Sequence, residues 1–225
     1  MTTPETALAA LAALADPARA AEIAALHRAP RRYLGAPPPQ VEALVAGWRG
    51  ALDVPGRVAL AAALWDSDIH EARIAAAKLL TQARLRPDAD AWALIATWAA
   101  DLDGRALADA AARAGARRLE ADPARLDRVE TWLDHPNPWT RHAALAMTRP
   151  WTKQNHPKPG DLAIRDRVLG WCARLAGDPD PILQTAIAGW LRELSKHDPD
   201  RVRGWLATAG GGLRPLARRE AETHL

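Results

Sequence analysis

The sequence is poor in several residue types, and each shortage excludes a class of site. None of its 225 residues is Phe, one is Tyr and one is Cys. The lone Cys172 excludes an internal disulfide and a multi-cysteine metal site, and its apolar helical setting predicts a buried thiol. Ser occurs only as Ser67 and Ser195, and neither lies in the motif of a nucleophilic serine. Without Phe, some of the ten Trp residues must fill the core.

Long apolar runs and strand-like alternation are also missing. No stretch is long enough to cross a bilayer, and the alanine-rich start lacks the basic region of a signal peptide. We therefore expect a cytoplasmic protein without membrane contact. His135, His142 and His156 are spaced unlike a helical zinc motif, so we expect no metal and no cofactor. The run Gly210–Gly212 lacks the Lys-Ser/Thr of a phosphate loop and is predicted to be a flexible linker.

Charge is nearly balanced overall but not along the chain. The formal net charge is +3, while residues 139–225 hold 14 Lys and Arg against 9 Asp and Glu. This excess favours an anionic partner for the C-terminal part. The alternative is that these cations simply keep helical faces solvated.

Helical periodicity is what the sequence has in abundance. Apolar residues recur at helical spacing, and Pro, Gly and Asp punctuate them. Helices are predicted to begin near Pro17, Pro55, Pro138, Asp161 and Pro179.

The helix starts also repeat. Residues 66–76 resemble residues 134–144 at an offset of 68, and weaker similarities follow at offsets of 35 and 44. A period in the thirties to forties with two helices per unit is typical of HEAT-like arrays. The predicted fold is all-α, a curved solenoid of HEAT-like antiparallel helix pairs forming a single domain over 1–225. In this register Asp109 and His142 occupy equivalent places in neighbouring repeats, which predicts that they lie close together.

One basic and aromatic segment is a candidate nucleic-acid face. It begins a helix at Asn137-Pro138, where free backbone N–H groups attract negative charge, and it continues to Lys153. Arg141, His142, Arg149, Trp151 and Lys153 alternate basic and flat groups there. Arg and Lys are suited to phosphates, and Trp to a sugar or base. The alternative places the Trp side chains between repeats, in the core.

A single carboxylate is the candidate for chemistry. Asp109 lies in an alanine-rich helical run, with Arg105 at i−4 and Arg113 at i+4. Such an acid is either paired with these arginines or a functional carboxylate in a cleft, and the sequence leaves both open.

Five segments in order resemble the DNA alkylation repair proteins of the AlkD type. One is Asn137-Pro-Trp-Thr-Arg-His142, similar to the family's Asn-x-Trp-x-x-Arg segment, and the others are residues 32–37, 64–80, 186–193 and 213–221. The resemblance implies a monomeric protein that removes cationic alkylated purines, such as 3-methyladenine or 7-methylguanine, from duplex DNA. In this family one Asp acts on the sugar, with aromatic rings beside it and an Arg on the DNA backbone.

Carried over to this sequence, the resemblance makes Asp109 the catalytic residue. It implies DNA contacts by Arg105, Trp139, Arg141, His142, Lys153 and Trp190. Three positions depart from the family pattern: Arg105 replaces an aromatic residue, His142 replaces the Arg, and Gly189 replaces a Trp. Trp98, on the preceding helix, is a candidate for the missing aromatic. Two hypotheses follow, a glycosylase that uses Asp109 or a divergent non-catalytic HEAT-like scaffold that binds nucleic acid or protein.

Overall fold

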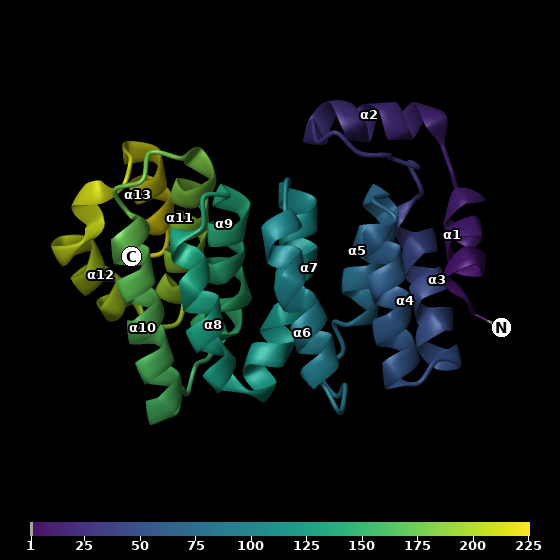
Figure 1. Cartoon of the computed structure of the whole chain (residues 1–225). Helices are drawn as coiled ribbons and strands as arrows, with labels where there is room; N and C mark the ends of the chain where they lie inside the picture. The colour runs from purple at the N-terminus through teal and green to yellow at the C-terminus, as the bar shows by residue number, and fades with distance from the viewer. Residues whose placement is uncertain (1) are drawn as a thin grey trace. The chain divides into compact units, whose positions relative to one another are not determined.

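The computed structural model describes residues 2–225 and confirms the all-α prediction. These residues form helices joined by turns, and their only strand-like feature is an isolated bridge between Arg32 and Ile69. The α-helices are α1 (Pro4–Ala12), α2 (Pro17–His27), α3 (Pro38–Ala51), α4 (Val54–Asp66), α5 (His70–Leu79), α6 (Ala89–Trp98), α7 (Arg105–Ala121), α8 (Leu126–Glu130), α9 (Pro138–Met147), α10 (Pro159–Leu175), α11 (Pro181–Ser195), α12 (Pro199–Thr208) and α13 (Pro215–Ala221). Short 3-10 helices connect several of them, among them η4 (Arg149–Lys153) and η5 (Gly210–Gly212) (Figure 1).

Proline and a capping side chain begin many of these helices, as the sequence predicts. Asp16, Asp53, Asn137 and Asp180 each accept a hydrogen bond from a backbone N–H of the first turn. Proline follows within two residues in all four cases, where its missing N–H costs nothing.

The chain divides into two compact units, residues 1–121 and 122–225. In the first, α5 packs against α3, α4 and α7. Its buried Ala72, Ala75 and Ala76 have short side chains that let these neighbours approach closely. The predicted single domain over 1–225 stays a prediction, and each unit is described by itself below.

The basic, proline-rich loop before α3 is held by one buried carboxylate. Glu71 of α5 accepts the backbone N–H groups of Leu34 at 2.9 Å and Gly35 at 2.8 Å. Gly35 has φ +76°, and a Cβ there would lie 2.2 Å from the carbonyl oxygen of Asp16, so only glycine fits. By contrast, α2 has no buried residue of its own and runs across the direction of α3–α5 (Figure 1).

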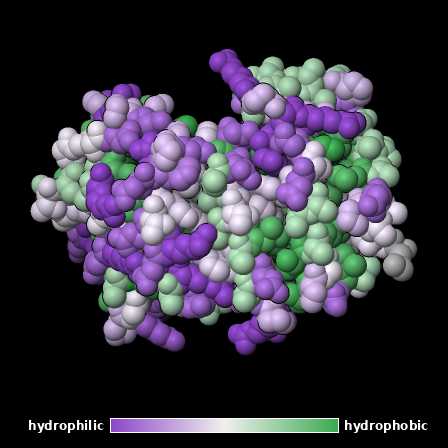
Figure 2. Space-filling view, in the orientation of Figure 1, coloured by the Kyte–Doolittle hydropathy of each residue, from purple (hydrophilic) through white to green (hydrophobic). Residues whose placement is uncertain are grey.

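In the second unit α11 is central and packs against α9, α12, α13 and η4. Trp171, Trp190 and Trp205 lie in this core, which confirms the prediction that Trp supplies the volume lost with Phe. The Cys172 thiol is buried beside them, and burial raises its pKa, as expected for an inert structural thiol. The visible surface of this unit is mainly hydrophilic (Figure 2).

Several polar contacts within each unit join residues that lie 36 or 37 positions apart. Glu71 binds Gly35 and Leu34, which lie 36 and 37 positions earlier. Arg141 pairs with Asp178, which lies 37 positions later. The Trp205 indole N–H donates to the Leu169 carbonyl, 36 positions earlier. This spacing matches the period in the thirties to forties seen in the sequence. Each repeat is therefore tied to the next by polar bonds as well as by apolar packing.

One detail of the sequence prediction is wrong. The glycine run is no flexible linker: it forms η5, and a Cβ on Gly212 would lie 2.9 Å from the Ala176 carbonyl carbon. Close backbone packing is what requires glycine there. As the sequence indicates, none of the helices in residues 2–225 has the length and apolar character needed to span a membrane.

Candidate functional site

Asp109 lies in the first two turns of α7, in the first unit. Its neighbours Ala108 and Ala110 are buried, while its own side chain stays 26% exposed. The Arg105 Nε lies 3.7 Å from Asp109 Oδ2, and the Arg105 side chain is 66% exposed. The expected i−4 pairing is therefore present, but it is longer than a hydrogen bond and open to solvent, so it contributes little energy.

Trp98 lies in the core of the same unit. Its side chain is 1% exposed and stacks on Trp65, with ring centroids 4.3 Å apart and planes 9° from parallel. Trp98 is thus a packing residue, and its ring is not presented beside a DNA sugar. Trp98 therefore does not replace the aromatic residue that the family pattern has at position 105.

The helix start at Asn137 forms as predicted and positions Trp139. The Asn137 side chain accepts the Trp139 N–H at 2.9 Å. The half-buried Trp139 ring meets the His142 ring edge to face, at 5.5 Å and 72°. His142 itself is 4% exposed. Trp139 retains surface for a ligand, whereas His142 supports that ring from within the unit and is not placed to contact a phosphate.

Arg141 is committed to an ion pair. Its Nη1 lies 2.5 Å from Asp178 Oδ2, at the start of the next repeat. The Asp180 backbone N–H and this Arg141 guanidinium together hold the pKa of Asp178 below its usual value. The predicted phosphate contact by Arg141 is corrected here, because the guanidinium already neutralises a carboxylate and joins two repeats.

Trp190 is also a correction. Its side chain is fully buried, and its indole N–H donates to the Thr148 hydroxyl at 3.1 Å. The predicted DNA contact would require this ring to leave the core. Gly189, one residue earlier, lies at the partly exposed side of α11 and offers only backbone.

Arg149, predicted to suit a phosphate, begins η4 and is half-buried. Its Nη2 lies 3.9 Å from the place where a Cβ on Gly189 would be. Arg149 begins η4 after the end of α9, and its sequence signal is only its place in the basic segment that ends at Lys153. The predicted DNA contact Lys153 ends the same 3-10 helix and is exposed.

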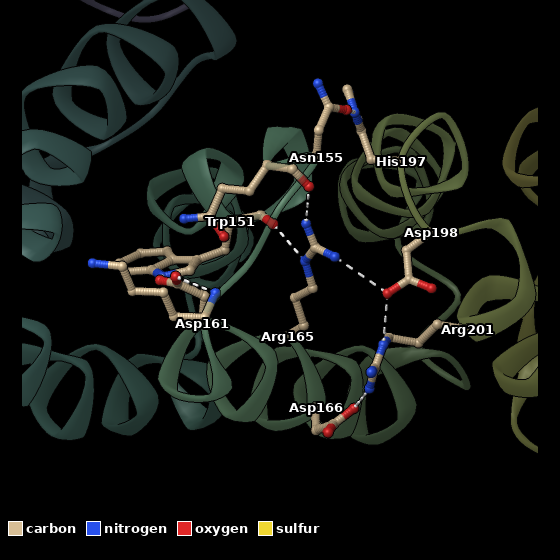
Figure 3. Close-up of polar contacts among 10 residues, drawn as sticks. Trp151, Asn155, Asp161, Arg165, Asp166, His197, Asp198 and Arg201 are labelled. Atoms are coloured by element: carbon tan, nitrogen blue, oxygen red, sulfur yellow. Dashed lines mark hydrogen bonds and ion pairs between the residues drawn. The ribbon is translucent and has the colours of Figure 1, made fainter.

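A buried arginine holds the basic segment that follows. The Arg165 Nε donates to the Trp151 carbonyl at 2.7 Å, and its Nη2 donates to the Gln154 carbonyl at 2.6 Å (Figure 3). Its Nη1 lies 3.2 Å from Asp198 Oδ2. Trp151 is buried and donates to Asp161 at 3.1 Å, so the core alternative applies to this Trp.

The described residues contain no group of three or more His, Cys, Asp or Glu side chains that could hold a metal ion. Asp109 lies in the first unit, and Trp139, Arg149 and Lys153 lie in the second. The predicted proximity of Asp109 and His142 therefore stays a prediction.

Comparison with known proteins gives one family. The family model described as "DNA alkylation repair enzyme" matches residues 7–225. A solved structure from Enterococcus faecalis, described as a predicted DNA alkylation repair enzyme, is similar with a TM-score of 0.74 at 19% identity, covering 94% of this chain and 96% of that one. AlkD2 from Streptococcus mutans is similar with a TM-score of 0.61 at 20% identity, covering 82% and 86%. At these identities the two structures support the fold, and no curated protein sequence matches the chain.

Proposed function

Because the chain belongs to the DNA alkylation repair enzyme family and has a role in alkylation repair, we propose that it is a monofunctional DNA glycosylase. Its substrates would be cationic alkylated purines, such as 3-methyladenine and 7-methylguanine, in duplex DNA. In this proposal the chain acts as a monomer without metal or cofactor, and Asp109 is the catalytic carboxylate.

The observation that carries the proposal is the state of Asp109. The residue is fixed in a helix whose adjacent alanines are buried, so its backbone is rigid. Its carboxylate is a quarter exposed, and the Arg105 Nε lies 3.7 Å from it. A rigidly held, partly exposed carboxylate can approach the sugar of a bound duplex and stabilise positive charge there.

The proposed reaction needs few protein groups, because the alkylated base is already a good leaving group. In a purine alkylated at N3 or N7 the base is already cationic, so the C1′–N bond can break with its electron pair leaving to the purine. Positive charge then develops on the sugar, and a carboxylate stabilises it and accepts a hydrogen bond from the attacking water. Water adds to C1′ and loses a proton to solvent, which leaves a free purine and an abasic site.

A second candidate, a non-catalytic scaffold that binds DNA or protein, is favoured by a specific observation. Arg105 stands where the family pattern has an aromatic ring, and Trp98 is buried and does not replace that ring. Groups that act together in catalysis lose much of their effect when one is missing. The two candidates differ in one measurable property, release of the base.

The deciding experiment follows base release from duplex DNA treated with a methylating agent. Asp109→Asn removes the charge and preserves the shape, and we expect a loss of at least about 100-fold in the single-turnover rate. Asp90→Asn is the matched control, the same change at an exposed position of α6 in the same unit, and it should leave the rate unchanged.

Thermal melting and binding to an uncleaved duplex test whether Asp109→Asn remains folded and able to bind DNA. No release by the wild-type chain would refute the glycosylase and leave the scaffold. Release that is equal in wild type and Asp109→Asn would show that another group does the chemistry.

A further inference from the structure

Arg149 is a half-buried arginine of the second unit that pairs with no carboxylate of residues 2–225. The other half-buried or buried arginines of this unit form ion pairs: Arg125, Arg141, Arg165, Arg167, Arg201 and Arg218. Within the described part of the chain, the Arg149 side chain makes neither an ion pair nor a hydrogen bond, and its nitrogens are not among the buried unpartnered atoms. Its stem is packed and its charged end is open to solution.

Gly189 keeps that end uncovered. A Cβ at this position would already be in van der Waals contact with Arg149 Nη2, at 3.9 Å. A longer side chain would reach across the guanidinium from the neighbouring helix. Glycine inside a helix costs about 0.5–1 kcal/mol relative to alanine, so a reason for its presence is expected. Access to Arg149 is such a reason.

Lys153 extends the charge along η4. Arg149 begins this 3-10 helix with its Nη2 close to Gly189, and the exposed Lys153 ends it four residues later. Four residues of 3-10 helix span roughly 8 Å along the axis, and the long side chains can adjust this spacing to successive phosphates of a strand. The Lys196 ammonium, bonded to Glu193 at 2.9 Å, holds the pKa of that carboxyl below its usual value, with Lys153 and His197 adding to the effect. Glu193 therefore stays ionised, and the Lys196 ammonium bonded to it balances its charge.

The support of these two cations is rigid. The backbone before η4 is tied to α11 by the Thr148–Trp190 bond, and the backbone after Arg149 is held by Arg165 at the Trp151 and Gln154 carbonyls (Figure 3). Cations fixed before a ligand arrives lose less conformational entropy on binding. A row of fixed cations without base-reading groups suits a phosphodiester backbone.

We propose that Arg149, above Gly189, and Lys153 bind successive phosphates of one strand of duplex DNA. This rests on the proposed DNA partner and adds to it the residues that grip the backbone, in place of Arg141 and His142. The contact is independent of base sequence and orients the duplex on the second unit.

The test measures the dependence of duplex affinity on salt. Each phosphate contact contributes about 0.9 to the slope of log K against log salt concentration. Arg149→Ala should lower the affinity and reduce the slope by about 1, and Arg149→Ala with Lys153→Ala by about 2. The control Arg203→Ala removes the same charge from an exposed arginine of α12 that pairs with Asp200, and it should change neither value appreciably.

The outcomes separate this inference from the proposed activity. If Arg149→Ala matches Arg203→Ala in slope and affinity, the contact is refuted, whatever the excision assay gives. A selective loss in Arg149→Ala supports the contact even where no base is released. Arg149→Gln, which preserves the packed stem, repeats the test should the alanine variant unfold. A wild-type chain that binds no duplex overturns the proposal.

Discussion

The Trp190 indole N–H and the Thr148 hydroxyl form a hydrogen bond of 3.1 Å between two fully buried side chains. The Thr148 hydroxyl in turn donates to the Leu145 carbonyl at 2.8 Å. The bond fixes α11 against the end of α9 and thereby fixes Arg149, the next residue. A core hydrogen bond thus determines the place of a surface cation.

Thr148→Val should destabilise the protein by about 1–3 kcal/mol. Valine has nearly the same shape but leaves a buried indole N–H without an acceptor, and that loss is larger than the net value of an average hydrogen bond. Urea unfolding measures the change. Thr148→Ser, which retains the hydroxyl, should lose clearly less than Thr148→Val, and equal losses would mean that the missing methyl contact dominates.

Substituting glycine by alanine should have opposite effects at two positions. Gly189→Ala should stabilise by about 0.5–1 kcal/mol, because alanine favours the helix and its Cβ meets only Arg149 Nη2 at 3.9 Å. Gly212→Ala should destabilise, because its Cβ would lie 2.9 Å from two backbone atoms, the Ala176 carbonyl carbon and the Gly177 nitrogen. Melting temperatures of both variants check the pair, and a shift of the same sign in both would contradict it.

Stability of the first unit should fall with acidity because of His70. This imidazole is buried and lies 4.9 Å from the His27 ring and 5.0 Å from the Tyr33 ring. Burial lowers the pKa of His70 to about 4, with Glu71 opposing the shift and His27 adding to it. Between the unfolded value of 6.5 and this value, the unfolded chain binds a proton that the folded chain does not.

The contribution of neutral His70 is therefore complete above pH 6.5 and is lost as the pH falls toward 4. The loss should reach about 2–3 kcal/mol. His70→Phe retains a ring in the stack and cannot titrate, so its unfolding free energy should depend less steeply on pH over this range. Parallel curves for the two proteins would show that His70 does not titrate with folding.

Much of the fold follows from local rules that the sequence displays. Asp16 and Asn137 cap helices because a short oxygen-bearing side chain before proline satisfies the first N–H groups. The lack of Phe forces tryptophans such as Trp171 into the core. Helical spacing and the period of similar helix starts then indicate stacked helix pairs.

The site is less predictable because long-range packing decides which cation is free. Arg141 and Arg149 belong to the same basic segment, and local spacing predicts that both bind a ligand. Asp178, 37 residues beyond Arg141, forms an ion pair with Arg141 and so competes with a ligand for it. Adjacent residues such as Arg141 and His142 are turned about 100° apart on a helix, so which of them faces inward depends on the next repeat.

Arg165 also makes the basic segment depend on sequence that lies far beyond it. Its partner Asp198 precedes α12, 33 positions further along the chain, and Arg201 braces the same carboxylate at 2.9 Å (Figure 3). A nonsense mutation just after Ser195 would leave every codon of η4 intact, yet it would strip the acid from a buried guanidinium and loosen residues 151–154. The part of the chain on which this surface depends therefore extends well past the residues that form it.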